Sequence, residues 1–147
     1  MDSLVKTHII QFIVMIIIGV CFNPMNMLAY SFDDLYLSLT LVYGGVLMAS
    51  NMMWSHEIVH YLSMGHFNLN VFLLGIVLSG ISVYLLRSQL FVNDEQWLKR
   101  MISHHSTALT TSEKILNTTN DLEVKELASD IIEIQQNEID IMKNMIN

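Results

Sequence analysis

The chain has 147 residues, of which 52% are hydrophobic and only 14% are charged. Soluble domains carry roughly 25% charged residues, and disordered chains are poor in apolar residues, so an intrinsically disordered chain is excluded. A formal net charge of −7 without a basic patch argues against a nucleic-acid partner. The single cysteine, Cys21, excludes a disulfide framework and a zinc module built on cysteines.

Charged residues divide the chain into two parts. Residues 1–90 hold two basic and four acidic residues, whereas residues 91–147 hold five basic and ten acidic residues. All six glycines and the single proline lie in the first part. We therefore expect an all-α protein with two domains, a transmembrane region over 1–90 and a helical hairpin over 91–147.

The first part contains three apolar stretches of the length that a bilayer requires. A span needs about 20 mainly apolar residues, and the sequence predicts transmembrane helices near 8–29, 35–55 and 68–90. We interpret the first stretch as a retained helix, because no small-x-small cleavage site of a signal peptide follows it. Small residues permit close helix contacts, and four glycines are candidates for this role: Gly44, Gly45, Gly75 and Gly80.

The positions of the basic residues bear on the orientation of the chain in the membrane. Lys6 precedes the first stretch, whereas Arg87, Lys99 and Arg100 follow the third one. The excess of basic residues on the cytoplasmic side of membrane proteins favours a cytoplasmic C-terminus by three residues to one.

The second part has the pattern of two amphipathic helices. Asn93 before acidic residues is a helix start, and Asn120 with Glu123 forms a second capping box. Apolar residues then recur at alternating steps of three and four, which predicts packed helices over 94–116 and 121–146. The short connection between them requires an antiparallel hairpin.

Polar side chains interrupt both apolar seams at one level of this hairpin. An antiparallel turn near 118–119 brings His105 opposite about residue 132, close to Gln135 and Glu138. Thioether and imidazole together favour copper, especially Cu(I), whereas a carboxylate also accepts Zn(II) or Cu(II). The candidate ligands are Met101, His104, His105 and Glu138, with Met142 one helical turn beyond Glu138. Methionines that only fill a core are the alternative interpretation.

Residues 91–147 resemble the helical, ferritin-like family called domain of unknown function 305. Its first motif, Met-Ile-Pro-His-His with a later Ala, corresponds to Met101, Ile102, Ser103, His104, His105 and Ala108. Its second motif corresponds to Ile131, Ile132, Gln135, Glu138, Ile139 and Met142. The three upstream apolar stretches resemble a membrane-anchored branch of the family. Two positions depart from the pattern, because Ser103 replaces Pro and Thr111 stands where Met is common.

The resemblance implies a copper-binding hairpin that acts in metal handling or tolerance, outside the cytoplasm. It implies ligands at Met101, His104, His105 and Met142, to which the seam pattern adds Glu138. We expect copper as the metal, with zinc as the second choice, in an integral membrane protein. We expect no enzyme activity. A structural or interaction module without metal is the non-enzymatic alternative.

A second motif, His56-Glu57-Ile58-Val59-His60, matches the zinc-peptidase signature. On a helix, this spacing puts two histidines on one face with Glu57 as a general base. A membrane-embedded zinc metallopeptidase is therefore the enzymatic alternative, although only a short loop follows the motif. Histidine at a membrane interface is the simpler interpretation. A third interpretation is a ladder for soft metal ions, with a donor at every fourth residue: Met48, Met52, His56 and His60.

Apolar residues outside the seams predict a homodimer formed through the hairpin. These residues are Trp97, Leu109, Leu116, Leu127, Ile132, Ile134, Ile139 and Ile141. Burying one such side chain is worth about 1.5–3 kcal/mol, and two hairpins make a four-helix bundle. The expected partners are therefore the lipid bilayer and a second copy of the chain.

Overall fold

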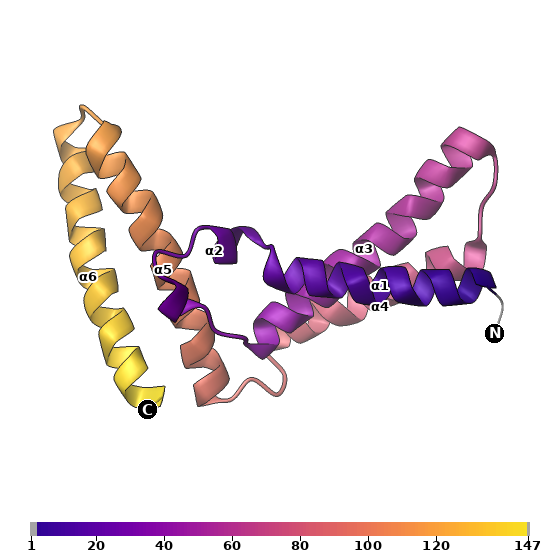
Figure 1. Ribbon diagram of the computed structural model, residues 1–147, viewed down its shortest axis with the longest axis horizontal. Coiled ribbons are helices and arrows are strands. Elements are labelled where there is room, and N and C mark those ends of the chain that lie inside the picture. Colours follow the sequence, from indigo (N-terminus) through magenta and orange to yellow (C-terminus); the bar gives the residue numbers. More distant parts are fainter. Residues whose placement is uncertain (1–2, 147) are drawn as a thin grey trace. The chain divides into compact units, whose positions relative to one another are not determined.

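The computed structural model describes residues 3–146, and all regular elements over this range are helices. In chain order they are α1 (Ser3–Cys21), α2 (Pro24–Met27), the 3₁₀ helix η1 (Phe32–Asp34), α3 (Leu39–Met64), α4 (Leu69–Ser88), α5 (Asp94–Thr118) and α6 (Leu122–Ile146) (Figure 1). The prediction of an all-α fold is confirmed. The chain forms two compact units, one from residues 1–22 and 39–91 and the other from residues 23–38 and 92–147.

In the first unit, α3 packs against both α1 and α4. The helices meet where side chains are smallest. A Cβ on Gly45 would lie 2.7 Å from a side-chain carbon of α1, and a Cβ on Gly75 would lie 2.9 Å from the Trp54 backbone nitrogen. These contacts leave no room for any other residue type. Gly44 and Gly80 have no neighbour within 4 Å of such a Cβ, so only two of the four expected glycines mediate close contacts.

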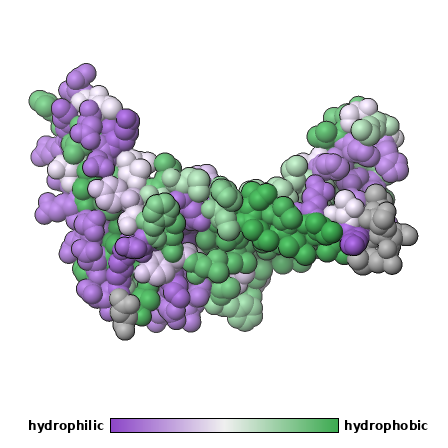
Figure 2. All heavy atoms as spheres, in the orientation of Figure 1, coloured by the Kyte–Doolittle hydropathy of each residue, from purple (hydrophilic) through white to green (hydrophobic). Residues whose placement is uncertain are grey.

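The outward-facing side chains of the first unit are large and apolar. Exposed residues on α1 and α4 include Ile9, Ile13, Ile17, Leu73, Val77 and Ile81. Figure 2 shows hydrophobic side chains gathered over the middle part of this unit, whereas the visible face of the hairpin is mostly hydrophilic. Ser50 and Ser82 are buried, and each hydroxyl donates to the backbone carbonyl four residues earlier. These two buried hydroxyls are thereby satisfied within their own helices.

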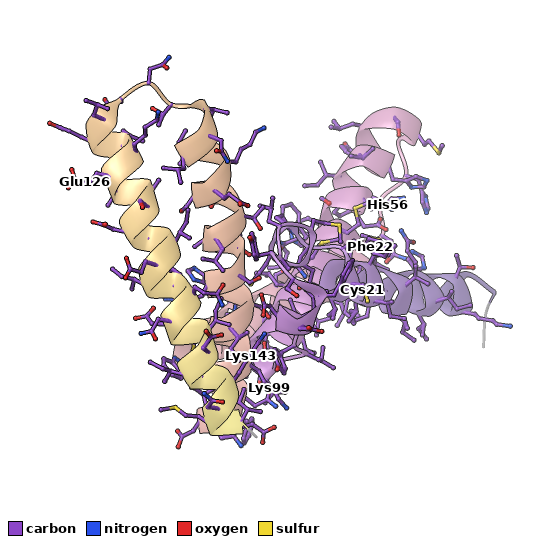
Figure 3. The ribbon with its side chains drawn as sticks, turned by 60° about the vertical axis from the view of Figure 1, so that its left-hand side comes forward. Cys21, Phe22, His56, Lys99, Glu126 and Lys143 are labelled. Carbon is purple, nitrogen blue, oxygen red and sulfur yellow. The ribbon has the colours of Figure 1, made fainter. Side chains whose placement is uncertain are left out.

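Two segments have the length and hydropathy of a membrane span, Lys6–Met27 and Leu69–Ser88. The first lies near the N-terminus, where a signal sequence has the same properties. The helix α1 itself ends at Cys21, well before the expected limit of 29 (Figure 3). The expected span over 35–55 corresponds to α3, which is not among these two segments. Polar residues such as Asn51 and His56 lower the hydropathy of α3.

The second unit is built on the antiparallel hairpin of α5 and α6 (Figure 1). Its bounds agree with the predicted helices. The Asn93 side chain accepts a hydrogen bond of 2.9 Å from the Gln96 backbone N–H and starts α5 as predicted. At the start of α6, Asp121 rather than Asn120 accepts from the Glu123 backbone N–H, at 2.9 Å. The core cluster consists of Leu98, Ile102, Leu109, Ile139 and Met142.

The Asn23–Ser38 segment belongs to the second unit, although the sequence pattern placed it in the transmembrane region over 1–90. Asn23 caps α2 by accepting from the Asn26 backbone N–H at 3.1 Å, and Pro24 follows at the first helical position. A proline after a capping residue starts a new helix, which interrupts the apolar run. The Arg100 guanidinium contacts the Met25 sulfur, so that α2 lies against α5.

A buried carboxylate ties this segment to both hairpin helices. Asp34 is only 3% exposed, and its Oδ1 pairs with Lys143 Nζ of α6 at 2.5 Å. Ser106 Oγ of α5 donates to Asp34 Oδ2 at 2.6 Å and accepts from the Tyr30 backbone N–H at 2.8 Å. Ser103 Oγ donates to the Asp34 backbone carbonyl at 2.8 Å. Partial burial works to lower the pKa of Lys143, but the hydrogen bond and charge of Asp34 outweigh it and raise this pKa above its ordinary value.

Candidate metal site in the hairpin

His105 and Glu138 form a direct pair between α5 and α6. The His105 residue is 8% exposed. Its Nδ1 lies 2.8 Å from the Met101 backbone oxygen, and its Nε2 lies 2.8 Å from Glu138 Oε2. Because a carbonyl oxygen can only accept, the geometry assigns a proton to Nδ1. In the neutral imidazole, Nε2 then carries a lone pair that faces the carboxylate.

The His105 Nε2 lone pair and the Glu138 carboxylate are both acceptors, so at a separation of 2.8 Å they need a proton or a metal ion between them. A proton satisfies the pair when it resides on Nε2 or on the carboxyl group. A metal ion can take the same place, because imidazole nitrogen and carboxylate oxygen are both common ligands. The Nδ1–H bond to a backbone carbonyl is the arrangement that orients metal-binding histidines. The Glu138 side chain is 46% exposed, so it has freedom to open the pair for an ion.

The other predicted ligands lie around this pair with different exposures. Gln135 Nε2 lies 3.5 Å from Glu138 Oε2. Met142 is buried in the core cluster, and Met101 packs against that cluster. Both side chains therefore lie in the surroundings that are typical of methionines that fill a core. The structure brings His105, Glu138 and Gln135 together, and it embeds the two methionines in the adjoining core.

His104 lies on the exposed side of α5, next to the pair. Its ring centroid is 5.9 Å from that of His105. Partial burial lowers the pKa of His104, and the positive charge of Arg100 and the neighbouring His105 lower it further. A lowered pKa keeps this imidazole neutral, which is the form that binds metals.

Nitrogen and oxygen ligands alone do not complete a site. Within residues 3–146, no group of three or more His, Cys, Asp or Glu side chains is placed to hold a metal ion. A metal bound by His105 and Glu138 would need donors of another kind. Thioether sulfur is such a donor type, and Met142 lies in the core cluster against which Met101 packs.

Sequence reasoning missed Asp34 as the anchor of the Asn23–Ser38 segment. The signals were the acidic pair Asp33–Asp34 between two apolar stretches and the hydroxyl residues Ser103, Ser106 and Thr107 on one face of α5. Ser103, at the position where the resembling family has Pro, bonds directly to this segment. The departure from the family pattern thus has a structural role.

The peptidase-like motif lies near the end of α3. The rings of His56 and His60 stack with centroids 5.7 Å apart. Glu57 is 4% exposed, and its Oε2 accepts a hydrogen bond of 2.8 Å from the Asn68 backbone N–H. The carboxylate of Glu57 therefore holds the connection between α3 and α4.

The fold and the site define a helical protein of two units, whose polar hairpin carries a buried histidine paired with a carboxylate. Residues 85–146 match the family described as Domain of unknown function (DUF305). The chain is 37% identical over 127 residues to "Uncharacterized protein L153" of Acanthamoeba polyphaga mimivirus. The aligned region covers 85% of this chain and 82% of the viral protein. The chain belongs to the same family as this viral protein, and its hairpin is a DUF305 domain. No solved structure matches the chain.

Proposed function

We propose that this protein is an integral membrane protein whose hairpin binds one soft metal ion, preferably Cu(I), in metal handling or tolerance. The observation that carries the proposal is the His105–Glu138 pair, in which the imidazole Nε2 lies 2.8 Å from a carboxylate oxygen. A buried imidazole with its tautomer fixed by the Met101 carbonyl is preorganised for a metal.

Thioether donors make copper the preferred ion at this pair. Met101 lies one helical turn before His105 on α5, and Met142 lies one turn after Glu138 on α6. Cu(I) favours imidazole and thioether, whereas the carboxylate makes Zn(II) the second choice. His104, whose pKa is lowered, is the additional imidazole within the resembling motif.

The packing of the first unit supports its insertion into a bilayer. Glycine and serine lie inside this unit, and isoleucine, valine and leucine lie on its outside. This distribution suits lipid, because association of helices there depends on close contact of small residues. The bilayer would then cover the exposed side chains of α1 and α4.

A Cu(I) competition titration of the full chain in detergent tests the hairpin site. We expect Glu138→Gln to weaken binding of one equivalent at least about tenfold, whereas Glu126→Gln, at an exposed position of the same helix (Figure 3), leaves it unchanged. The combined Met101→Ala, His104→Ala and His105→Ala variant should lose this equivalent. Binding by this triple variant that equals binding by the unmodified chain would contradict the proposal.

A further inference from the structure

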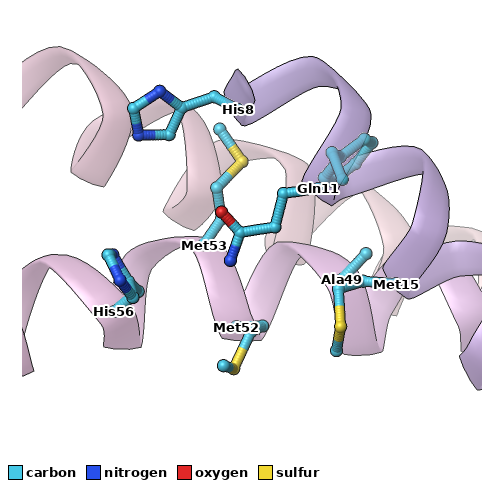
Figure 4. A pocket seen from close by; sticks show the side chains of 8 residues that line it. His8, Gln11, Met15, Ala49, Met52, Met53 and His56 are labelled. Atoms are coloured by element: carbon cyan, nitrogen blue, oxygen red, sulfur yellow. The ribbon is translucent and has the colours of Figure 1, made fainter. Parts of the chain in front are cut away.

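A small pocket between α1 and α3 is lined by sulfur and imidazole groups (Figure 4). Its lining residues are His8, Gln11, Phe12 and Met15 from α1 and Ala49, Met52, Met53 and His56 from α3. The cavity volume is about 20 Å³, which is room for a single water-sized guest. Both helices belong to the first unit, so this pocket shares no residue with the hairpin.

Helical spacing explains why these donors converge. The four lining positions on each helix are separated by steps of three, one and three residues, which places them on one face. In Figure 4 the Met53 side chain reaches from α3 towards α1, between His8 and Gln11. His56 stands one turn further along α3 and lines the same space. Two helix faces thus present thioether and imidazole groups to one another.

We propose that this pocket binds one soft monovalent cation, Cu(I), through thioether and imidazole groups centred on Met53, His56 and His8. Met15 lines the same pocket and offers further sulfur, whereas the Met52 side chain is 42% exposed and points away from α1 in Figure 4. Sulfur and imidazole donors select Cu(I), whereas hard divalent cations prefer oxygen. None of the described lining residues is acidic, so a single positive charge is the most that these neutral donors are suited to hold.

A row of imidazoles connects the pocket with the end of α3. The ring of His56 stacks on that of His60 at 5.7 Å between centroids, and His60 meets His66 edge-on at 5.6 Å. His66 lies in the connection between α3 and α4 and is exposed. Exchangeable imidazole ligands therefore run from an exposed position to the pocket, which supplies the entry path that a metal site requires.

Copper stoichiometry of the full chain in detergent, measured by Cu(I) titration against a chelator, distinguishes the pocket from the hairpin. The His105→Ala/Glu138→Ala variant should still bind one equivalent. Adding Met53→Leu and His56→Gln to that variant should remove this equivalent, with affinity falling at least about tenfold. Met64→Leu is the matched control, because Met64 is an exposed methionine of α3 outside the pocket.

The outcomes separate the two sites. If the hairpin binds no copper, the unmodified chain binds one equivalent that depends on Met53 and His56 alone. Unchanged stoichiometry on adding Met53→Leu and His56→Gln, or an equal loss with Met64→Leu, would overturn the pocket site. X-ray absorption needs no pocket substitution when all five proposed hairpin ligands, Met101, His104, His105, Glu138 and Met142, are replaced by alanine and one equivalent of Cu(I) is added. Mixed sulfur and nitrogen scattering supports the pocket, and a shell without sulfur contradicts it.

Discussion

The two units of this protein differ in whether they bury large apolar residues. In the hairpin, leucine and isoleucine lie inside, as at Leu98 and Ile102, together with serines such as Ser103 and Ser106. In the unit of α1, α3 and α4, glycine and serine lie inside, as at Gly75 and Ser82, while large aliphatic residues lie outside. Burial in water rewards large apolar groups, whereas helices in lipid associate through close contact of small residues. The large apolar residues inside the hairpin suit folding in water, and the small residues inside the first unit suit the bilayer that we propose for it.

The buried residues of α3 give information about its surroundings that its hydropathy does not. Helix α3 is not among the segments with the hydropathy of a span. It nevertheless buries Gly45, Ala49 and Ser50 while exposing larger apolar side chains such as Met48. Its packing pattern thus matches that of its neighbour α4. We therefore expect α3 to share the bilayer with α1 and α4 in the proposed membrane protein.

The largest loss in the free energy of unfolding is expected in the hairpin unit, when the Asp34–Lys143 ion pair is broken. Lys143→Met leaves the buried Asp34 carboxylate without its cation, which costs about 3–5 kcal/mol for pairs of this kind. The raised pKa of Lys143 makes the contribution of the pair complete below about pH 10 and lost only as the pH rises through that pKa. Denaturant unfolding of the detergent-solubilised chain should show an equal loss at pH 6 and pH 9.

The exposed Lys125 of α6 provides the control for this prediction. Lys125→Met should change the free energy of unfolding by less than about 0.5 kcal/mol, as surface substitutions do. Equal effects of Lys143→Met and Lys125→Met would show that Asp34 does not hold the Asn23–Ser38 segment to the hairpin.

A smaller loss of stability is expected when a closely packed glycine of the first unit is replaced by alanine. Gly75→Ala puts a Cβ 2.9 Å from the Trp54 backbone nitrogen, and overpacking of this kind costs about 1–3 kcal/mol. Gly80→Ala meets open space on the same helix, and it should be neutral or stabilise by about 0.5–1 kcal/mol. Thermal unfolding in one detergent compares the two variants directly. A Gly80→Ala variant no more stable than Gly75→Ala would refute small-residue packing of α3 against α4.

The smallest effect concerns association of hairpins. Leu109 and Ile139 were expected on exposed flanks, but they are only 2% and 1% exposed because they pack inside one hairpin. A stripe at seven-residue spacing remains exposed on α6: Leu127, Ile134 and Ile141. We expect a second copy to cover this stripe, so Leu127→Cys in a Cys21→Ser background should crosslink in membranes. Glu126→Cys, on a neighbouring face, should crosslink less, and equal yields from both positions would argue against the dimer.

The hairpin was predictable because capping residues and apolar periodicity agree over its whole length. The contact of His105 with Glu138 was predictable only to within about two helical turns, since the expected register put His105 opposite about residue 132. The turn lies slightly later than assumed, and helical side chains lean towards the N-terminus, so Glu138 reaches back to His105. The position of Asn23–Ser38 was not predictable, because its apolar start resembles a membrane span and its anchor, Lys143, is distant in sequence.

The most direct test of the metal-binding hairpin observes His105 itself. Nitrogen NMR of the full chain labelled at histidine, in detergent, reports each ring nitrogen, and His105→Gln assigns the signal. We predict that Nδ1 of His105 stays protonated against the Met101 carbonyl, while Nε2 shifts on addition of Cu(I) and returns when a chelator removes it. An Nε2 signal of His105 that does not change at saturating Cu(I) would contradict the account.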